Sequence, residues 1–385
     1  MKKKLKDVCD FYSGTGFPTK YQGEMEGDYP FYKVGDISNN ATTGKVYLEL
    51  CNNYISKDIA KTIKGCILPK DTVVFAKIGE ALKLNRRAIT SCACLIDNNA
   101  MGIAPKIDQL RIQYFFFFMK NLKMQSLAES TTVPSVRKTK LENYEIEVPS
   151  MEAQEEIEKK LALISDIIEK RKQELVGLDD LIKARFVEMF GMPGADDFSW
   201  GLVPLGSVCH INPKKGQDSR LSSGVEVSFV PMPAVTECGE IDATAVKEYD
   251  EVKTGFTYFA ENDVLFAKIT PCMENGKGAV ARGLCNGLGF GSTEFHVLRP
   301  ISGKSNPYWI YTLTAFSQFR EDAANNMTGS AGQRRVPAFF LENYRVAVPP
   351  IELQNEFADF VHQVDKSKVV VMNGGENRCL RKTML

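Results

Sequence analysis

The sequence predicts an α+β protein of two tandem mixed α/β domains, joined by long antiparallel coiled-coil-like helices in a pseudo-two-fold internal duplication. One observation is that residues 141–157 and 341–357 are identical at nine of 17 positions. Another is that strand-like alternation gives way, after each repeat, to apolar residues spaced by four and three. A period near 200 residues is too long for a solenoid, so each copy should be a domain with a helix attached.

The duplication extends over three blocks that keep the same order in both copies. The longest begins with Leu-Glu-Asn-Tyr at residues 141 and 341, and a Phe-Ala-Lys-Ile block lies at 75–78 and at 266–269. The third block pairs residues near the start of each copy: Leu5/Leu205, Val8/Val208 and Cys9/Cys209. Three blocks in one order indicate a tandem duplication.

We expect one domain at residues 1–149 and the other at 192–349. Short β-type runs between Gly, Asn and Asp turns predict strands. They lie at 29–34, 72–78, 88–95 and 144–148 in the first copy, and at 228–230, 263–269, 279–281 and 344–348 in the second. Each copy also has one apolar segment of helical length, at 108–127 and at 307–324.

A long helix is expected over residues 150–191, because an apolar seam runs through it and requires a helical partner. The apolar seam positions used for pairing are Ile157, Leu161, Ile164, Ile168, Leu175, Leu178 and Ile182. The partner is a second helix over 350–385, with seam positions Phe357, Val361 and Val364. Lys368 interrupts that seam, and Gly374-Gly375 predicts that the second helix is shortened or divergent after residue 371.

Composition bounds the class of protein. The 385 residues are 44% hydrophobic with a formal net charge of zero, which disfavours a protein that binds nucleic acids non-specifically through its net charge. The ten cysteines form no C-x-x-C pair, so we expect free thiols in a cytoplasmic protein. The most hydrophobic segment, residues 114–119, is far too short to span a bilayer, and no membrane partner is expected.

Several strings resemble catalytic motifs without completing them. The stretch 11–16 lacks the strand and helix that flank an S-adenosylmethionine loop. Asn306-Pro307-Tyr308-Trp309 lacks the second proline of the Asn-Pro-Pro-aromatic clamp, and an N-cap followed by proline explains it. Gly303-Lys304-Ser305 lacks the earlier glycine of a P-loop.

Catalytic and metal-binding residues are therefore not expected. The three histidines do not recur between the copies, and none stands at metal-ligand spacing. A duplicated chain with no duplicated acid, base or nucleophile is better explained as a binder than as an enzyme.

Basic clusters near the repeated blocks favour DNA as the ligand. Two domains on a helical spacer suit a bipartite site; a straight helix over 151–190 would span roughly 60 Å, an upper bound near 17 base pairs. Arginine forks can bind guanine or phosphate, and Gln can read adenine. The candidate contacts are Lys77, Arg86, Arg87, Arg137, Lys138, Lys140, Lys268, Gln333, Arg334 and Arg335.

At this point the chain resembles the specificity subunits of type I restriction–modification systems. The order domain, Leu-Glu-Asn-Tyr-x-x-x-Val-Pro, long helix occurs twice and covers nearly the whole chain. The stretch from Phe266 to Lys277 is similar to a frequent string in the family's target-recognition domains, which adds Lys277 to the candidates, and 329–337 is similar to another.

The resemblance implies two target-recognition domains, each reading half of a bipartite double-stranded DNA sequence. It also implies helices that set the gap and dock two modification (adenine methyltransferase) subunits, with restriction subunits joining them. S-adenosylmethionine would bind the modification subunits, and this chain would hold no cofactor. The alternatives are a fragment of, or partner in, a fused DNA-modification enzyme, and a two-headed protein-binding scaffold.

Overall fold

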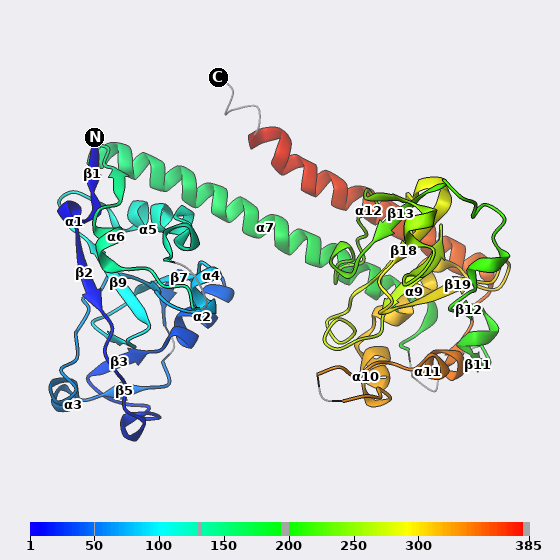
Figure 1. Cartoon of the computed structure of the whole chain (residues 1–385), viewed down its shortest axis with the longest axis horizontal. Coiled ribbons are helices and arrows are strands. Elements are labelled where there is room, and N and C mark those ends of the chain that lie inside the picture. Colours follow the sequence, from blue (N-terminus) through cyan, green and yellow to red (C-terminus); the bar gives the residue numbers. More distant parts are fainter. Residues whose placement is uncertain (50, 130–132, 194–199, 331, 380–385) are drawn as a thin grey trace. The chain divides into compact units, whose positions relative to one another are not determined.

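The computed structural model describes residues 1–49, 51–129, 133–193, 200–330 and 332–379. The chain divides into two compact units, Met1–Ile167 and Ile168–Leu385, and the division falls inside the long helix α7 (Met151–Phe190). Each unit contains mixed sheets and helices (Figure 1). The predicted fold class, two mixed α/β domains with long helices, is confirmed.

Unit 1 is built on a five-stranded sheet with the order β2-β9-β6-β7-β4. Its strands are β2 (Cys9–Ser13), β4 (Tyr47–Leu48), β6 (Val73–Ala76), β7 (Arg87–Thr90) and β9 (Ala100–Pro105). A three-stranded sheet has the order β5-β3-β8, with β3 (Tyr29–Tyr32), β5 (Tyr54–Ile55) and β8 (Leu95–Ile96). A third sheet pairs β1 (Lys2–Lys4) with β10 (Glu145–Glu147).

Helices complete unit 1. The longest before α7 is α5, which with the 3-10 turn η2 (Met124–Leu127) occupies the predicted helix 108–127. The helices are α1 (Leu5–Val8), α2 (Val34–Thr42), α3 (Lys57–Thr62), α4 (Glu80–Lys83), α5 (Ile112–Asn121) and α6 (Lys138–Glu142), and a further 3-10 turn is η1 (Thr19–Tyr21).

Unit 2 repeats this plan with two four-stranded sheets, β12-β19-β16-β17 and β14-β13-β18-β15, and a pair β11-β20. The strands are β11 (Leu202–Pro204), β12 (Cys209–Ile211), β13 (Glu226–Val230), β14 (Val246–Glu248), β15 (Thr257–Ala260), β16 (Val264–Ala267), β17 (Gly278–Val280), β18 (Leu288–Gly291), β19 (Phe295–Pro300) and β20 (Arg345–Ala347). Both units contain parallel strand pairs: β3 with β8 and β4 with β7 in unit 1, and β13 with β18 in unit 2.

The helices of unit 2, besides its part of α7, include two in place of the single helix predicted at 307–324. The chain turns to extended backbone at Phe316 (φ −67°, ψ 143°), which divides that segment. The helices are α8 (Tyr249–Val252), α9 (Pro307–Ala315), α10 (Ser317–Asn325), α11 (Ala338–Asn343) and α12 (Ile351–Cys379). The 3-10 turns are η3 (Leu205–Ser207), η4 (Lys215–Gln217), η5 (Met232–Ala234) and η6 (Cys285–Gly287).

The central strands β6 and β16 explain the repeated Phe-Ala-Lys-Ile block. Val73 and Phe75 belong to the core that contains α5, whereas Val74 packs on the opposite side with β3 and β8. In unit 2, Phe266 packs with α9 and α10, and Leu265 lies in the opposite core. Side chains alternate between the two faces of a strand, so a strand buried on both faces is apolar throughout.

The repeated Leu-Glu-Asn-Tyr block closes each unit. Leu141 and Leu341 are fully buried in α6 and α11. The carbonyl of the following tyrosine accepts a hydrogen bond from the amide of Leu5 in unit 1 (2.9 Å) and of Leu205 in unit 2 (2.8 Å). The block therefore ties the last strand of each unit to its first helical turn.

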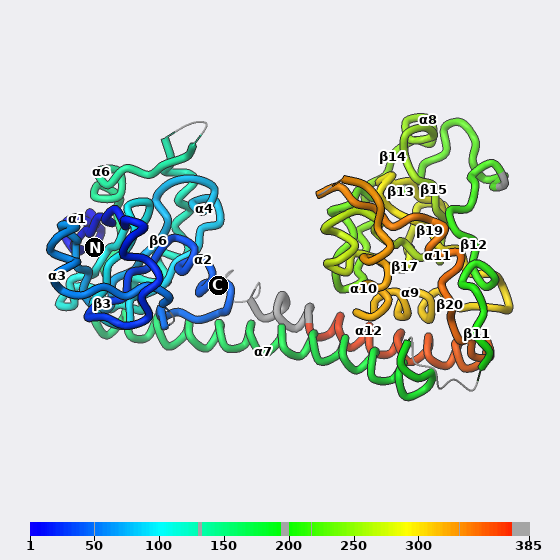
Figure 2. Tube along the Cα trace, turned by 90° about the horizontal axis from the view of Figure 1, so that it is seen from below, coloured from blue at the N-terminus to red at the C-terminus, as the bar shows by residue number. Residues whose placement is uncertain are grey.

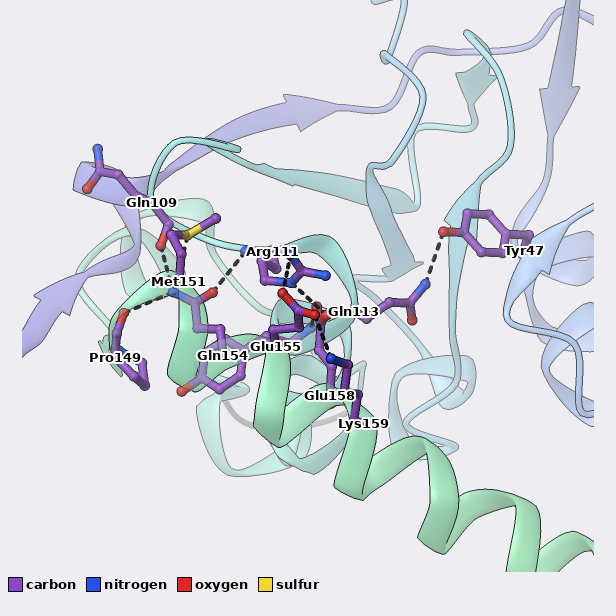
Figure 3. Close-up of polar contacts among 11 residues, drawn as sticks. Tyr47, Gln109, Arg111, Gln113, Pro149, Met151, Gln154, Glu155, Glu158 and Lys159 are labelled. Atoms are coloured by element: carbon purple, nitrogen blue, oxygen red, sulfur yellow. Dashed lines mark hydrogen bonds and ion pairs between the residues drawn. The ribbon is translucent and has the colours of Figure 1, made fainter.

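A buried glutamine joins each unit to the helix that follows it. Gln154 accepts a hydrogen bond from the amide of Arg111 (2.9 Å) and donates to the carbonyls of Gln109 (2.9 Å) and Pro149 (3.0 Å) (Figure 3). Next to it, Glu158 accepts hydrogen bonds from Arg111 Nε and the amide of Tyr114.

Unit 2 repeats the glutamine joint with different neighbours. Gln354 accepts from the amide of Asn306 (2.9 Å) and donates to the carbonyls of Lys304 (3.2 Å) and Pro349 (2.8 Å). These six partners are all backbone groups, and Gln154 Nε2 lies in addition 3.8 Å from Met151 Sδ. This explains why a glutamine occurs at the same place in both copies of the sequence.

The two long helices pack against each other within unit 2. There α12 and the C-terminal part of α7 lie side by side (Figure 1, Figure 2). Phe186 contacts Phe357 edge-to-face, with ring centroids 5.5 Å apart, and Arg185 pairs with Glu356 at 3.1 Å. Lys368 reaches Asp179 at 2.6 Å, so residues later in α12 meet earlier ones in α7 and the pair is antiparallel.

Part of the predicted seam packs in this way. Leu178 and Ile182 of α7 belong to the same core as Phe357, Val361 and Val364 of α12. By contrast Ile164 and Ile168 are 42% and 51% exposed, and Ile157, Leu161 and Leu175 are half-buried. The positions buried by helix pairing in unit 2 also include Phe186 and Phe190, which the predicted seam omitted.

The glycine pair does not end α12 where the sequence predicted, although α12, with 29 residues, is shorter than α7, with 40. The helix continues to Cys379, through Gly374 and Gly375, and does not end after residue 371. Glycine inside a helix costs roughly 1 kcal/mol relative to alanine but does not stop it. Lys368 interrupts the apolar pattern as predicted, and its ammonium group is paired with Asp179 and Asp365.

Candidate functional site

Each unit presents a loop that docks on the end of its central strand. In unit 1 the amide of Val136 donates to the carbonyl of Lys77, and in unit 2 that of Val336 donates to Lys268, both at 2.9 Å. The amides of Lys77 and Lys268 donate in turn to the carbonyls of Asn99 and Glu294. The repeated lysine therefore occupies the same backbone position in both units.

The basic residues of the unit 1 loop and of α6 lie at the surface, each near a carboxylate. Arg137 pairs with Glu129 at 2.7 Å, and Lys140 lies 3.9 Å from the same carboxylate. Lys138 lies 3.6 Å from Glu142 and over the ring of Phe11. These pairs are solvent-exposed, so their charges remain accessible to another ligand.

The unit 2 loop is pinned at its base. Thr328 and Arg335 exchange backbone hydrogen bonds of 3.0 and 2.8 Å, and Arg335 also forms a bridge with Ile269 beyond β16. Gly329 has φ +118°, and a Cβ there would lie 2.9 Å from the carbonyl of Gln333, so the close turn requires glycine. Gln333 and Arg334 are exposed in this loop, and Arg334 lies 3.8 Å from Glu274.

Arg335 and Glu294 form a two-point ion pair. Arg335 Nε donates to Glu294 Oε2 at 2.9 Å and Nη2 donates to Oε1 at 2.8 Å. These hydrogen bonds hold the pKa of the Glu294 carboxyl below its usual range. Nearby, burial lowers the pKa of Lys268, which the carboxylate of Glu294 opposes. The pair places a fixed guanidinium at the end of the strand.

Two remaining candidates have less defined surroundings. Lys277 is partly exposed, and its ammonium lies 3.5 Å from the carbonyl of Met232. Arg86 is partly exposed in the turn before β7. Neither belongs to the two docked loops.

Arg87 is not a surface contact, and its assignment to DNA is corrected. It is 4% exposed, with Nη2 donating to the carbonyl of Leu122 and the side chain of Asn85 at 2.8 Å each, and Nη1 to the carbonyl of Asn85. Burial lowers the pKa of its guanidinium to about 10. Arg87 therefore supports the local fold. The sequence did not indicate this role, because Arg86 and Arg87 together resemble a basic surface cluster.

The carboxylates of the site were not predicted. Three carboxylates lie opposite the arginines, those of Glu129, Glu274 and Glu294. No spacing in the sequence predicts them. Glu294 and Arg335 are 41 residues apart and meet only because β19 returns beside β16.

The incomplete catalytic strings have structural roles. The side chain of Asn306 accepts from the amide of Tyr308 at 2.9 Å and caps α9, with Pro307 following, as predicted. Ser305 is buried and donates to the carbonyl of Val208. Within the described ranges no cluster of His, Cys, Asp and Glu has the arrangement of a metal site. Among the helices of those ranges, none has the length and hydropathy to cross a membrane.

Comparison with known proteins gives a family match to each of the two copies. The family model described as "Type I restriction modification DNA specificity domain" matches residues 1–176 and 199–378, one match for each copy. The repeated fold and the paired loops define a protein with two similar domains. The chain belongs to the type I restriction–modification DNA specificity domain family.

Relatives of known name are similar to part of this chain. The specificity subunit of the type I restriction enzyme EcoAI from Escherichia coli is 40% identical over 158 residues, 40% of this chain and 26% of that protein. That of EcoEI, also from Escherichia coli, is 41% identical over 152 residues, 39% and 25% of the two chains. The chain therefore spans about a quarter of the length of these curated relatives.

A solved structure shows the same fold over most of the chain. A chain in a structure titled for complex assembly and conformational transition of the type I R-M system aligns with a TM-score of 0.52. It is 18% identical, with 98% of this chain and 93% of that chain covered.

Proposed function

We propose that this chain is the DNA sequence-recognition subunit of a type I restriction–modification complex. The observation that carries the proposal is the pair of equivalent loops, each docked on the same end of its unit's central strand and each bearing surface arginines. Each unit would read one half of a bipartite double-stranded target. Base edges would specify the sequence, and Lys77, Arg86, Arg137, Lys138, Lys140, Lys268, Lys277, Gln333, Arg334 and Arg335 would supply base or phosphate contacts.

The helices have a separate task in this proposal. α7 and α12 would set the gap between the half-sites and dock two adenine methyltransferase subunits, with restriction subunits joining the complex in the cytoplasm. The exposed apolar residues of α7, among them Ile164 and Ile168, support a docking role because exposed apolar stripes mark interaction surfaces. S-adenosylmethionine would bind the methyltransferase subunits and not this chain.

Sequence selection tests the proposal directly. The purified chain with its methyltransferase subunits is mixed with random-sequence DNA, bound DNA is recovered by gel shift, and the pool is sequenced. We expect enrichment of two short motifs separated by a fixed gap. Recovery of unselected sequences would contradict the proposal and favour a protein-binding scaffold.

Arg334 and Arg335 give a sharper prediction. Arg334→Ala with Arg335→Ala should weaken binding of the selected DNA, because two cations are lost from the loop. The slope of log affinity against log salt should become shallower by about 0.9 for each lost phosphate contact. The control is Arg220→Ala, which removes a surface arginine that is paired with Asp218 elsewhere in unit 2. An unchanged slope would mean that neither loop arginine contacts a phosphate.

A further inference from the structure

We infer that Glu294 is a positioning residue that aims Arg335 at a guanine in the half-site read by unit 2. The inference rests on the proposed function and assigns one base within it. Its basis is the juxtaposition of a two-point ion pair, a pinned loop and a partly exposed guanidinium.

The donors of Arg335 are divided between the protein and the surface. Nε and one N–H of Nη2 donate to Glu294, and one N–H of Nη1 donates to the carbonyl of Gln333 at 3.0 Å. A guanidinium has five N–H groups. Two N–H groups therefore remain without a partner among the described residues, one on each terminal nitrogen, while the side chain is 41% exposed.

Two donors on adjacent nitrogens match the acceptors O6 and N7 of guanine in the major groove. A free arginine samples many rotamers and binds phosphate as readily as a base. Here the carboxylate fixes the plane of the guanidinium, and the backbone bridge between Thr328 and Arg335 fixes the chain that carries it. Fixing a donor pair before binding lowers the entropic cost of using it.

Glu294 also offsets the positive charge of Arg335, which weakens attraction to phosphates of any sequence. Its side chain is 26% exposed, so the pair stays close to solvent and to a ligand at the surface. Glu294 thus favours the base contact over the phosphate contact. That combination makes it specificity-determining without requiring it to touch DNA.

Unit 1 has no such pair at the corresponding backbone positions. Asn99 takes the place of Glu294, since its carbonyl accepts from Lys77 as that of Glu294 accepts from Lys268. Ser135 takes the place of Arg335, since it bridges Ile78 as Arg335 bridges Ile269. At these two described positions, the Arg–Glu pair that we assign to guanine recognition is present in unit 2 and absent from unit 1.

The test uses Glu294→Gln in the full chain assembled with its methyltransferase subunits. Affinity is measured for the selected sequence, for all single substitutions in the half-site of unit 2, and for unrelated DNA. We expect about ten-fold loss on the selected sequence, near 1.4 kcal/mol and within the range for one bidentate base contact. Affinity for unrelated DNA should stay level or rise, and discrimination should relax at one G·C pair. Arg335→Lys keeps the charge but loses the fork, so it should relax the same pair.

The outcomes separate the possible roles of Glu294. A fall in both affinities would make Glu294 a purely structural residue, and a rise in both would make it a charge screen; either result overturns the inference. Unchanged discrimination at every G·C pair overturns it as well. Glu251→Gln, which removes a carboxylate 3.9 Å from Lys247 in the same unit, is the matched control and should leave the preference intact. If the wild-type chain selects no sequence at all, the proposed function itself fails.

Discussion

Buried polar residues in unit 2 show how single side chains make the fold depend on pH. His296 is 5% exposed, with Nε2 donating to the carbonyl of Val336 at 2.8 Å and Nδ1 accepting from the amide group of Asn212 at 3.0 Å. Burial lowers the pKa of this imidazole, so the neutral form is favoured in the folded chain. The Nε2 bond ties the docked loop to β19, and acceptance from Asn212 at Nδ1 requires the neutral ring.

The lowered pKa predicts the sign of a pH effect. Below the ordinary histidine pKa of 6.5 the unfolded chain binds the proton more readily, so stability present above pH 6.5 is lost as pH falls through the folded pKa. We expect His296→Gln to flatten the decline in melting temperature of unit 2 between pH 7 and pH 5. His210→Gln, at an exposed position, is the control. Parallel melting curves for wild type and His296→Gln would exclude this role.

Residue identity alone did not predict the polar contacts of the site. Arg86 and Arg87 are neighbours with the same charge, yet one is partly exposed and the other 4% exposed under an internal hydrogen-bond network. Glu294 was missed for the opposite reason, because its partner lies 41 residues away. Charge patterns give candidate residues, but sheet pairing decides which of them meet.

At the scale of elements, periodicity and repetition predicted more. The Phe-Ala-Lys-Ile block was expected to be a strand, and β6 and β16 are strands because both of their faces are buried. The seam predicted that α7 pairs with a helix, and this is confirmed in unit 2 for Leu178 and Ile182. A heptad pattern shows that a face needs a partner, but it does not identify how many of its positions one partner covers.

The glutamine joint gives a prediction for unit 2. Gln354→Ala should leave the amide of Asn306 and the carbonyl of Pro349 without buried partners, which costs about 1–3 kcal/mol for each unsatisfied group. Denaturant unfolding should therefore show a lower free energy of unfolding for unit 2. Gln363→Ala, on the exposed face of α12, is the control. An equal effect of the two substitutions would mean that the buried hydrogen bonds contribute little.

For the whole molecule, the balanced charge is consistent with recognition that depends on local geometry. The formal net charge is zero with 48 basic and 48 acidic residues, and the arginines of the docked loops face carboxylates. Under the proposed function, attraction to any duplex would therefore be modest, and base contacts would carry a larger share of the selectivity. The duplication in the sequence predicted two domains. The charge pairs across each loop could be identified only from the structure.

Division of labour is the corresponding prediction for the assembly. The chain incubated with S-adenosylmethionine and its selected DNA should transfer no methyl group, because residues 11–13 lie in the strand β2 and Asn306 caps α9, in place of a cofactor loop and a catalytic clamp. Addition of methyltransferase subunits should restore transfer, measured with radiolabelled methyl groups. Turnover by the isolated chain would favour the fused-enzyme alternative.

Under the proposed function, the two glutamine joints have a consequence for how such a protein would acquire new targets. The domain-side partners of Gln154 and Gln354 are main-chain groups, and the residues that supply those groups differ between the copies, Gln109 and Arg111 in one and Lys304 and Asn306 in the other. A domain substituted into either unit therefore keeps the hydrogen bonds to the glutamine as long as its backbone follows the same path there. Each domain can then be exchanged as a whole, and its side chains can change without a change in the helix that follows it.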